Sequence, residues 1–165
     1  QQAKAFFDAQ AAHIEPILEK EKTGLSVAFF AVASDGTITV RKPNDYVSSM
    51  IELAGGTYSL NGYVPEEENA LSTLKMQMED FYAAEKDADI LIYNGTIEGE
   101  LTSIDELVQK NSLFADFKAV KTGQVYTTGS NFYQQSTGTC DFIEDLNQIL
   151  TGEGDGTYRF LKKLQ

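Results

Sequence analysis

The stretch Ala88–Gly99 constrains the fold more than any other part of this chain. It contains the continuous apolar run Ile90-Leu91-Ile92, which is the pattern of a strand buried on both faces of a sheet. Asn94-Gly95 ends this run, and helical patterns lie before and after it. Helix, buried strand, loop and helix form the unit of an open α/β sheet, where ligands gather beyond the carboxyl ends of the strands. The sequence therefore predicts an α/β fold with a candidate ligand loop at residues 94–100.

The composition is that of one acidic globular domain. The 165 residues, 42% of them hydrophobic, are enough to bury an ordinary core. No run approaches the roughly 20 apolar residues that a membrane helix needs. Twenty-five acidic residues against 13 basic ones leave a formal charge of −12. Because nucleic-acid binders normally present a basic patch, we expect no nucleic-acid partner.

Helical and strand patterns alternate along most of the chain, which predicts a three-layer fold with a mainly parallel sheet flanked by helices. Ser103 and Glu106 have the spacing of a capping box, and Asn44 or Asp45 can cap another helix. The expected elements are a helix over 3–22, strands over 25–33 and 38–41, a helix over 45–54, a strand over 57–60, a helix over 73–86, a strand over 89–93, a helix over 103–110, a last strand within 119–128 and a helix over 140–150. Residues 151–165 have the pattern of a Gly-rich tail.

Three segments carry a resemblance to a known family. Val47-Ser-Ser-Met-Ile-Glu-Leu-Ala-Gly-Gly56 is a helix that ends in a double glycine. Gln77-Met-Glu-Asp-Phe-Tyr leads through Asp87-Ala-Asp-Ile-Leu-Ile into the central strand, and Phe117-Lys-Ala-Val-Lys-Thr-Gly-Gln-Val-Tyr126 follows. In this order and spacing, residues 25–150 resemble the C-terminal lobe of the substrate-binding proteins of bacterial iron-complex ABC importers, which carry siderophores, haem or cobalamin.

The resemblance implies one lobe of a two-lobed, periplasmic-binding-protein-like architecture in which a single long helix joins the lobes. Residues 1–23 would be the end of this connector helix, 24–150 the ligand-binding lobe and 151–165 the C-terminal tail. The first residues open directly in helical periodicity, so we expect a processed or truncated chain whose N-terminal lobe and lipid anchor are missing. The implied partners are an iron complex and an ABC transporter permease, the implied location is extracytoplasmic (periplasmic or cell-surface lipoprotein), and no cofactor is expected.

Nine candidate ligand-binding residues lie in three loops that follow strands. They are Arg41, Lys42, Tyr46, Asn94, Thr96, Glu98, Asn131, Tyr133 and Gln134. In the resembling family the first loop faces the cleft, and a pair of cations with a phenol suits an anionic iron chelate. Rings and amides in the third loop suit a ligand wall, and the Tyr133 phenolate is a candidate contact to iron or haem. Each loop has an alternative interpretation as an ordinary solvated turn or linker.

Glu79 occupies the position where the resembling family has an acidic residue at a helix start. Such glutamates dock onto basic residues of the membrane permease, so Glu79 is the candidate for that contact. The alternative is compensation of the helix dipole by Glu79 together with Asp80.

The chain lacks the usual sequence patterns of enzymes. Its one histidine, His13, is expected to be structural or at the surface, because a single His without a nearby carboxylate cluster makes a poor metal site. Its one cysteine, Cys140, is expected to pack as a small hydrophobe. We therefore predict a binding protein without a catalytic or metal site. The alternatives are a chelatase-like, metal-handling enzyme, which would need a His or carboxylate cluster in the cleft, and an interaction domain without a small ligand.

Overall fold

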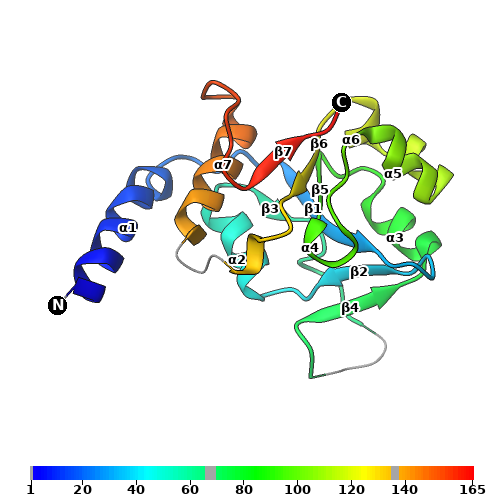
Figure 1. The fold of residues 1–165 in the computed structure, drawn as a ribbon, viewed down its shortest axis with the longest axis horizontal. Helices are drawn as coiled ribbons and strands as arrows, with labels where there is room; N and C mark the ends of the chain where they lie inside the picture. The colour runs from blue at the N-terminus through cyan, green and yellow to red at the C-terminus, as the bar shows by residue number, and fades with distance from the viewer. Residues whose placement is uncertain (1, 66–69, 135–137) are drawn as a thin grey trace.

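A computed structural model describes residues 2–65, 70–134 and 138–165 of the chain. Its helices and strands alternate as the sequence predicts (Figure 1). They are α1 (Gln2–Leu18), β1 (Ser26–Val32), β2 (Ile38–Arg41), α2 (Tyr46–Leu53), β3 (Thr57–Tyr58), β4 (Thr73–Met76), α3 (Met78–Glu85), β5 (Ile90–Tyr93), α4 (Gly95–Glu98), α5 (Ile104–Lys110), the 3-10 helix η1 (Ser112–Asp116), α6 (Lys118–Lys121), β6 (Val125–Thr128), the 3-10 helix η2 (Phe132–Gln134), α7 (Thr139–Thr151) and β7 (Leu161–Lys163).

The strands form one mixed sheet in the order β4-β2-β1-β5-β6-β7, with β3 pairing the N-terminal half of β1. The pairs of β1 with β3, β1 with β5, and β5 with β6 are parallel. The outer strands β2, β4 and β7 join antiparallel. Every residue of β5 is buried, as expected for the central strand. The predicted fold class, a mainly parallel sheet flanked by helices, is confirmed.

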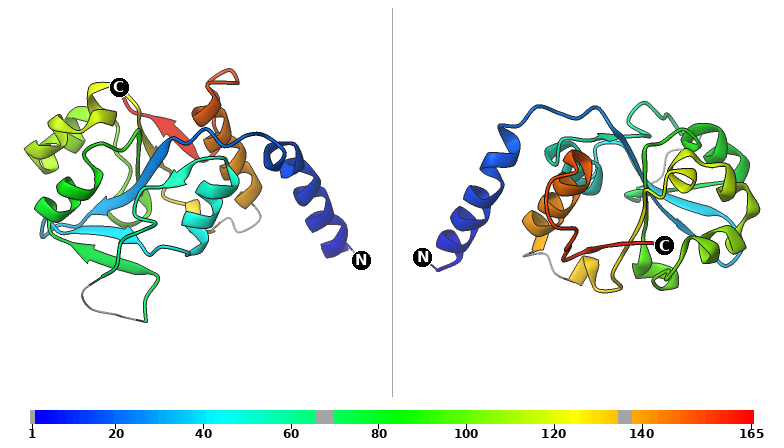
Figure 2. Two further views of the ribbon diagram at one scale, coloured as in Figure 1. Left: turned by 180° about the vertical axis from the view of Figure 1, so that it is seen from behind. Right: turned by 90° about the horizontal axis from the view of Figure 1, so that it is seen from above.

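Alternate side chains of β1 enter two separate aromatic cores, one on each face of the sheet. The ring of Phe29 contacts Phe132, which packs against Phe142 of α7. The ring of Phe30 points to the other face, where it stacks on Phe114 of η1 and contacts Phe81 of α3. Helices α2 and α7 accordingly cover one face, and α3, α5 and α6 the other (Figure 2, right). The three predicted layers are thus two helical layers around one sheet.

The predicted helix over 73–86 is wrong in its first five residues. Residues 73–76 form the edge strand β4, which pairs antiparallel with β2, and α3 begins only at Met78. Leu74 and Met76 alternate with exposed positions, and this alternation runs directly into the apolar periodicity of α3. The pairing to β2, which the local sequence does not reveal, decides the strand.

Residues 151–165 are more than a Gly-rich tail. The chain returns to the sheet as β7, and Phe160, Leu161 and Leu164 are buried. The Asp145 carboxylate of α7 accepts hydrogen bonds from the backbone N–H groups of residues 159–161 at 2.7–3.2 Å. An acidic group in α7 therefore anchors a strand that the sequence pattern does not predict.

Helix α1 extends away from the rest of the molecule and contacts it mainly through α7 (Figure 1). Pro16 lies inside this helix, and most of its described side chains are exposed. Among the described residues, no helix combines the length and the apolar character needed to cross a membrane. The assignment of α1 as a connector between lobes stays a prediction.

Candidate ligand-binding site

The candidate site begins with an ion pair at the start of α2. The guanidinium group of Arg41, the last residue of β2, pairs with the Asp45 carboxylate. Asp45 also caps α2, because its Oδ1 accepts the backbone N–H of Ser48 at 2.9 Å. The side chains of Arg41 and Asp45 are only 11% and 8% exposed. One carboxylate thus fixes both the helix start and the direction of the guanidinium group.

Two tyrosine rings cover this guanidinium group. The Arg41 Cζ atom lies 5.1 Å from the centre of the Tyr46 ring and 5.8 Å from that of Tyr133, within the range of cation–π contacts. The two rings meet edge to face, with centroids 6.2 Å apart. Tyr46 is 50% exposed and Tyr133 38% exposed, whereas Arg41 is almost buried beneath them. The outward surface is therefore phenolic, with the cation below it.

Asn94 joins the second predicted loop to the third. Its Nδ2 donates to the Tyr133 hydroxyl oxygen at 3.2 Å, and its Oδ1 accepts from the N–H and hydroxyl groups of Thr96. Asn94 is the N-cap of the short helix α4, so residues 94–100 are not the plain loop that the sequence predicts. Gly95 permits α4 to lie close to the end of β6, because a Cβ atom at this position would lie 2.4 Å from the Thr128 carbonyl oxygen. We call Arg41, Asp45, Tyr46, Asn94 and Tyr133 the Arg41 cluster.

Both phenols of the Arg41 cluster are neutral near physiological pH. Burial raises the pKa of Tyr46 to about 12, and the neighbouring Tyr133 adds to this shift. Burial also raises the pKa of Tyr133, against the opposing effect of Arg41. The Tyr46 hydroxyl donates to that of Tyr133, so the Tyr133 proton is the one that can be donated to an anion. The same shift opposes the predicted role of Tyr133 as a phenolate contact, since forming that anion costs more here than in water.

A small hollow lies beside the Arg41 cluster. It has a volume of about 230 Å³, and its lining includes Tyr46, Tyr133, Met50 and Phe160. Ligand pockets of drug-sized molecules usually enclose about 300–1,000 Å³. The hollow has an apolar floor and a phenolic rim but is too small to enclose such a ligand by itself.

Among the residues whose side chains the structure describes, five of the nine predicted residues form one network. Arg41, Tyr46, Asn94, Thr96 and Tyr133 form one contact network. The others are Lys42, which is half-buried, Glu98 and Asn131, which are exposed, and Gln134, whose side chain lies outside the described residues.

The ion pair of Asp45 with Arg41 differs from the prediction, in which Asp45 is only a possible helix cap and Arg41 a cation available to a ligand. The spacing of four residues between them was the available signal, although this spacing pairs charges reliably only within a helix. The Asp45 carboxylate offsets the positive charge that the prediction assigned to this loop.

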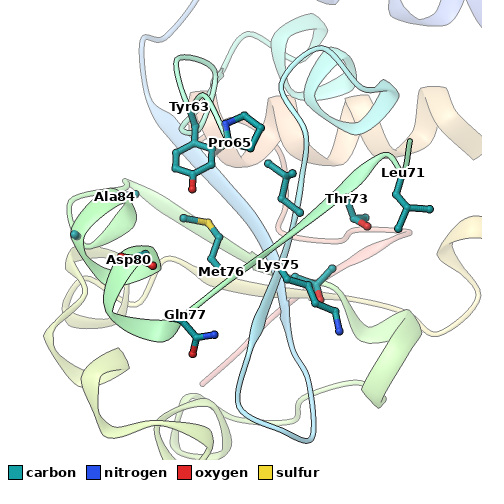
Figure 3. A pocket seen from close by; sticks show the side chains of 12 residues that line it. Tyr63, Pro65, Leu71, Thr73, Lys75, Met76, Gln77, Asp80 and Ala84 are labelled. Atoms are coloured by element: carbon teal, nitrogen blue, oxygen red, sulfur yellow. The ribbon is translucent and has the colours of Figure 1, made fainter. Parts of the chain in front are cut away.

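A larger cavity lies elsewhere, between the edge strand β4, helix α3 and the segment around Tyr63. Its volume is about 840 Å³, and Figure 3 shows Tyr63, Met76 and Asp80 at its border. None of the nine predicted residues lines it. Residues 66–69, which continue this segment, lie outside the described residues. Its lining carries polar side chains, among them Lys75, Gln77 and Asp80, but the predicted residues converge at the Arg41 cluster, so we place the candidate site there.

Two further predicted positions are defined by the structure. Glu79 is exposed in the first turn of α3, where the sequence predicts it, and its role stays a prediction.

His13 was expected to lack neighbouring carboxylates, and this is wrong. His13 Nε2 lies 3.1 Å from Glu144 Oε2, and Asp141 is close to both. The two helices that carry these residues are far apart in sequence, so only the tertiary structure reveals the cluster.

Comparison with known proteins identifies the family. The family described as "Periplasmic binding protein" matches residues 1–132. The chain belongs to the periplasmic binding protein family. An uncharacterized lipoprotein of Methanocaldococcus jannaschii is 26% identical over 166 residues, which cover 98% of this chain and 38% of that protein.

Solved periplasmic binding proteins share the fold of this chain. The TroA-like periplasmic binding protein FepB from Veillonella parvula has a TM-score of 0.69 at 13% identity, over 99% of this chain and 56% of that one. The siderophore periplasmic binding protein from the fuscachelin gene cluster of Thermobifida fusca has a TM-score of 0.66 at 17% identity, over 93% and 55%. An ABC transporter substrate-binding protein from Listeria monocytogenes EGD-e has a TM-score of 0.64 at 18% identity, over 92% and 57%.

The chain thus spans about half the length of these solved structures and 38% of the curated relative. Half a chain is the extent expected for one lobe of a two-lobed receptor. The family and these structural neighbours are binding proteins and not enzymes. The predicted resemblance to one lobe of an importer's binding protein is confirmed.

Proposed function

We propose that this chain is the C-terminal lobe of the substrate-binding protein of an ABC importer, and that it helps to capture an anionic iron complex such as a ferric siderophore. The Arg41 cluster is the observation that supports this proposal. Three segments distant in sequence converge there on a surface with two neutral phenols, above a buried amide and a buried cation. A phenol hydroxyl can donate a hydrogen bond to an oxygen of a chelate, and the rings provide apolar contact area.

The size of the hollow supports a ligand site that is shared between two lobes. A volume of about 230 Å³ suits one wall of a ligand cleft, with the opposite wall supplied by a second lobe. Closure of two lobes around a ligand is a common form of domain motion in binding proteins. Glu79, exposed at the start of α3, is proposed to contact the permease in the loaded state.

The neighbours support the class of ligand only by analogy. The Thermobifida fusca structure is described as a siderophore binding protein, and a Staphylococcus epidermidis structure as a possible iron-binding protein, with a TM-score of 0.67 to this chain. The lipoprotein description of the Methanocaldococcus jannaschii relative supports an extracytoplasmic location with a lipid anchor outside the present sequence. A metal-handling enzyme is less favoured, since His13 lies outside the Arg41 cluster and the Asp45 carboxylate is occupied by Arg41.

The test is ligand titration of the two-lobed protein that contains this chain. Ferric siderophores, haem and cobalamin are each titrated, with isothermal calorimetry and thermal shift as the readouts. We expect saturable binding of one anionic class. Tyr133→Phe and Tyr46→Phe keep the rings and remove one donor each, which should weaken binding by about 3- to 10-fold.

The matched control is Tyr63→Phe, which removes a hydroxyl beside the other cavity and should leave affinity unchanged. The proposal fails if no complex binds to the folded protein. It also fails if both variants of the Arg41 cluster bind the ligand as tightly as the wild type.

A further inference from the structure

Helices α1 and α7 bring together three side chains that commonly bind metal ions. His13 lies on α1, and Asp141 and Glu144 lie one turn apart on α7, where the two helices run side by side (Figures 1 and 2). One ligand atom from each residue can be chosen so that all three lie within 4.8 Å of one another. Imidazole nitrogen and carboxylate oxygen are the usual ligands of zinc in sites that keep an open position.

The spacing of these atoms is close to that of a coordination shell. With bonds of about 2.1 Å, the ligand atoms of a tetrahedral ion lie roughly 3.4 Å apart. His13 Nε2 and Glu144 Oε2 are already 3.1 Å apart. Their side chains are 47% and 40% exposed, so rotation about their side-chain bonds meets little obstruction. Asp141 is only 16% exposed, so His13 and Glu144 are the side chains that would turn toward it.

The charges also suit a divalent ion. Two carboxylates and a neutral imidazole balance a charge of +2. Asp141 Oδ2 lies 2.7 Å from Arg159 Nη1, but the Arg159 side chain is 64% exposed, and a carboxylate has a second oxygen for a metal. The mixture of one nitrogen and two oxygen donors suits zinc, cobalt or nickel, whereas Mg²⁺ and Ca²⁺ prefer oxygen alone.

The side of α1 that carries His13 also carries a buried polar atom, beside the apolar contacts that Ile14 and Ile17 make with the core. Gln10, one turn before His13 on the same side of α1, has a buried Oε1 atom with no hydrogen-bond partner among the described residues. We propose that His13, Asp141 and Glu144 bind a divalent transition-metal ion of the zinc class, with water in the remaining coordination positions. The ion ties α1 to α7 and so fixes the direction in which α1 leaves the sheet domain. This site shares no residue with the Arg41 cluster and does not depend on the proposed function.

The experiment uses residues 1–165 without an affinity tag. Zn²⁺ is titrated by calorimetry and Co²⁺ by visible absorption, with Mg²⁺ as the comparison ion. We expect one Zn²⁺ per chain, a Co²⁺ spectrum that Zn²⁺ abolishes, and no competition from Mg²⁺. His13→Ala and Glu144→Gln should each weaken Zn²⁺ binding by at least the 10- to 100-fold typical of changes around metal ligands.

The matched control is Glu15→Gln, which removes an exposed negative charge two residues from His13 and should leave affinity unchanged. Melting curves in EDTA verify that each variant is folded. Absence of saturable Zn²⁺ binding overturns the proposal, and so does binding that His13→Ala and Glu144→Gln leave unaltered. An equal loss in Glu15→Gln also overturns it, since general surface charge would then explain the binding.

Hydrogen exchange tests whether the ion joins the two helices. Saturating Zn²⁺ should slow amide exchange in α1 of the wild type and leave α1 of His13→Ala unchanged. If Zn²⁺ binds without altering exchange in α1, the proposed link between α1 and α7 is wrong.

Discussion

Glu85, at the end of α3, is a carboxyl group buried without compensation. It is 1% exposed, and neither of its oxygens has a hydrogen-bond partner among the described residues. The adjacent Ser59 hydroxyl donates to the Val27 carbonyl oxygen instead. Burial raises the pKa of Glu85 from 4.5 to about 7, with only a weaker opposing effect of Ser59. We predict that this one side chain makes the protein less stable as the pH rises.

The sign and size of the effect follow from the two pKa values. Below pH 4.5 Glu85 is protonated in both the folded and the unfolded state, so it causes no penalty. As the pH rises from 4.5 to 7, the unfolded state releases the proton first, and the free energy of unfolding falls. A difference of about 2.5 pKa units at 1.36 kcal/mol each makes a total loss of about 3 kcal/mol by pH 8.

The assay is urea unfolding of the wild type and Glu85→Gln at pH 4.5, 6 and 8. Glutamine resembles the protonated glutamate in shape and stays neutral, so the two proteins should have similar stability at pH 4.5. The stability of the variant relative to the wild type should then rise by about 3 kcal/mol by pH 8. The control, Glu79→Gln, alters an exposed glutamate of the same helix and should show no such trend. A difference between Glu85→Gln and wild type that is constant with pH would refute the reasoning.

Three further substitutions test the contacts that hold the site and the sheet edge. Asp45→Ala removes the cap of α2 and leaves Arg41 buried without its partner. We therefore expect the free energy of unfolding, measured in urea, to fall by about 3 kcal/mol. A fall of less than about 1 kcal/mol would contradict the described pairing. Gly95→Ala forces a Cβ atom against the Thr128 carbonyl oxygen and should lower stability by about 1–3 kcal/mol; an unchanged melting temperature would show that the close approach is wrong. Asp145→Ala removes the acceptor of three backbone N–H groups and should selectively speed hydrogen exchange in β7, whereas uniform or unchanged exchange would argue against the anchor.

Local sequence was sufficient wherever one short segment carries its own signal. The runs around Phe29 and Leu91 are apolar at every position, and both are buried strands of the sheet. Ser103 caps α5 as its spacing to Glu106 predicts, with Oγ accepting the Glu106 N–H at 3.2 Å. Burial of continuous apolar runs and hydrogen bonding at helix ends depend on neighbours in sequence, so a linear pattern records them.

Strands at the sheet edges depended on partners that the sequence does not name. Residues 73–76 form β4 because β2 offers unpaired backbone groups, and residues 161–163 form β7 because β6 and Asp145 hold them. Their own side-chain patterns are short and fit more than one structure.

The Arg41 cluster combines both kinds of information. The sequence by itself marked Arg41, Tyr46, Asn94 and Tyr133 as polar or aromatic residues that follow strands, because ligand loops occur at strand ends in α/β folds. Only the tertiary structure decided that these four side chains touch, that Asp45 neutralises Arg41, and that two tyrosine rings cover the guanidinium group. The physical reason is that hydrogen bonds and ion pairs act over a few ångströms in space, whereas a sequence records proximity only along the chain.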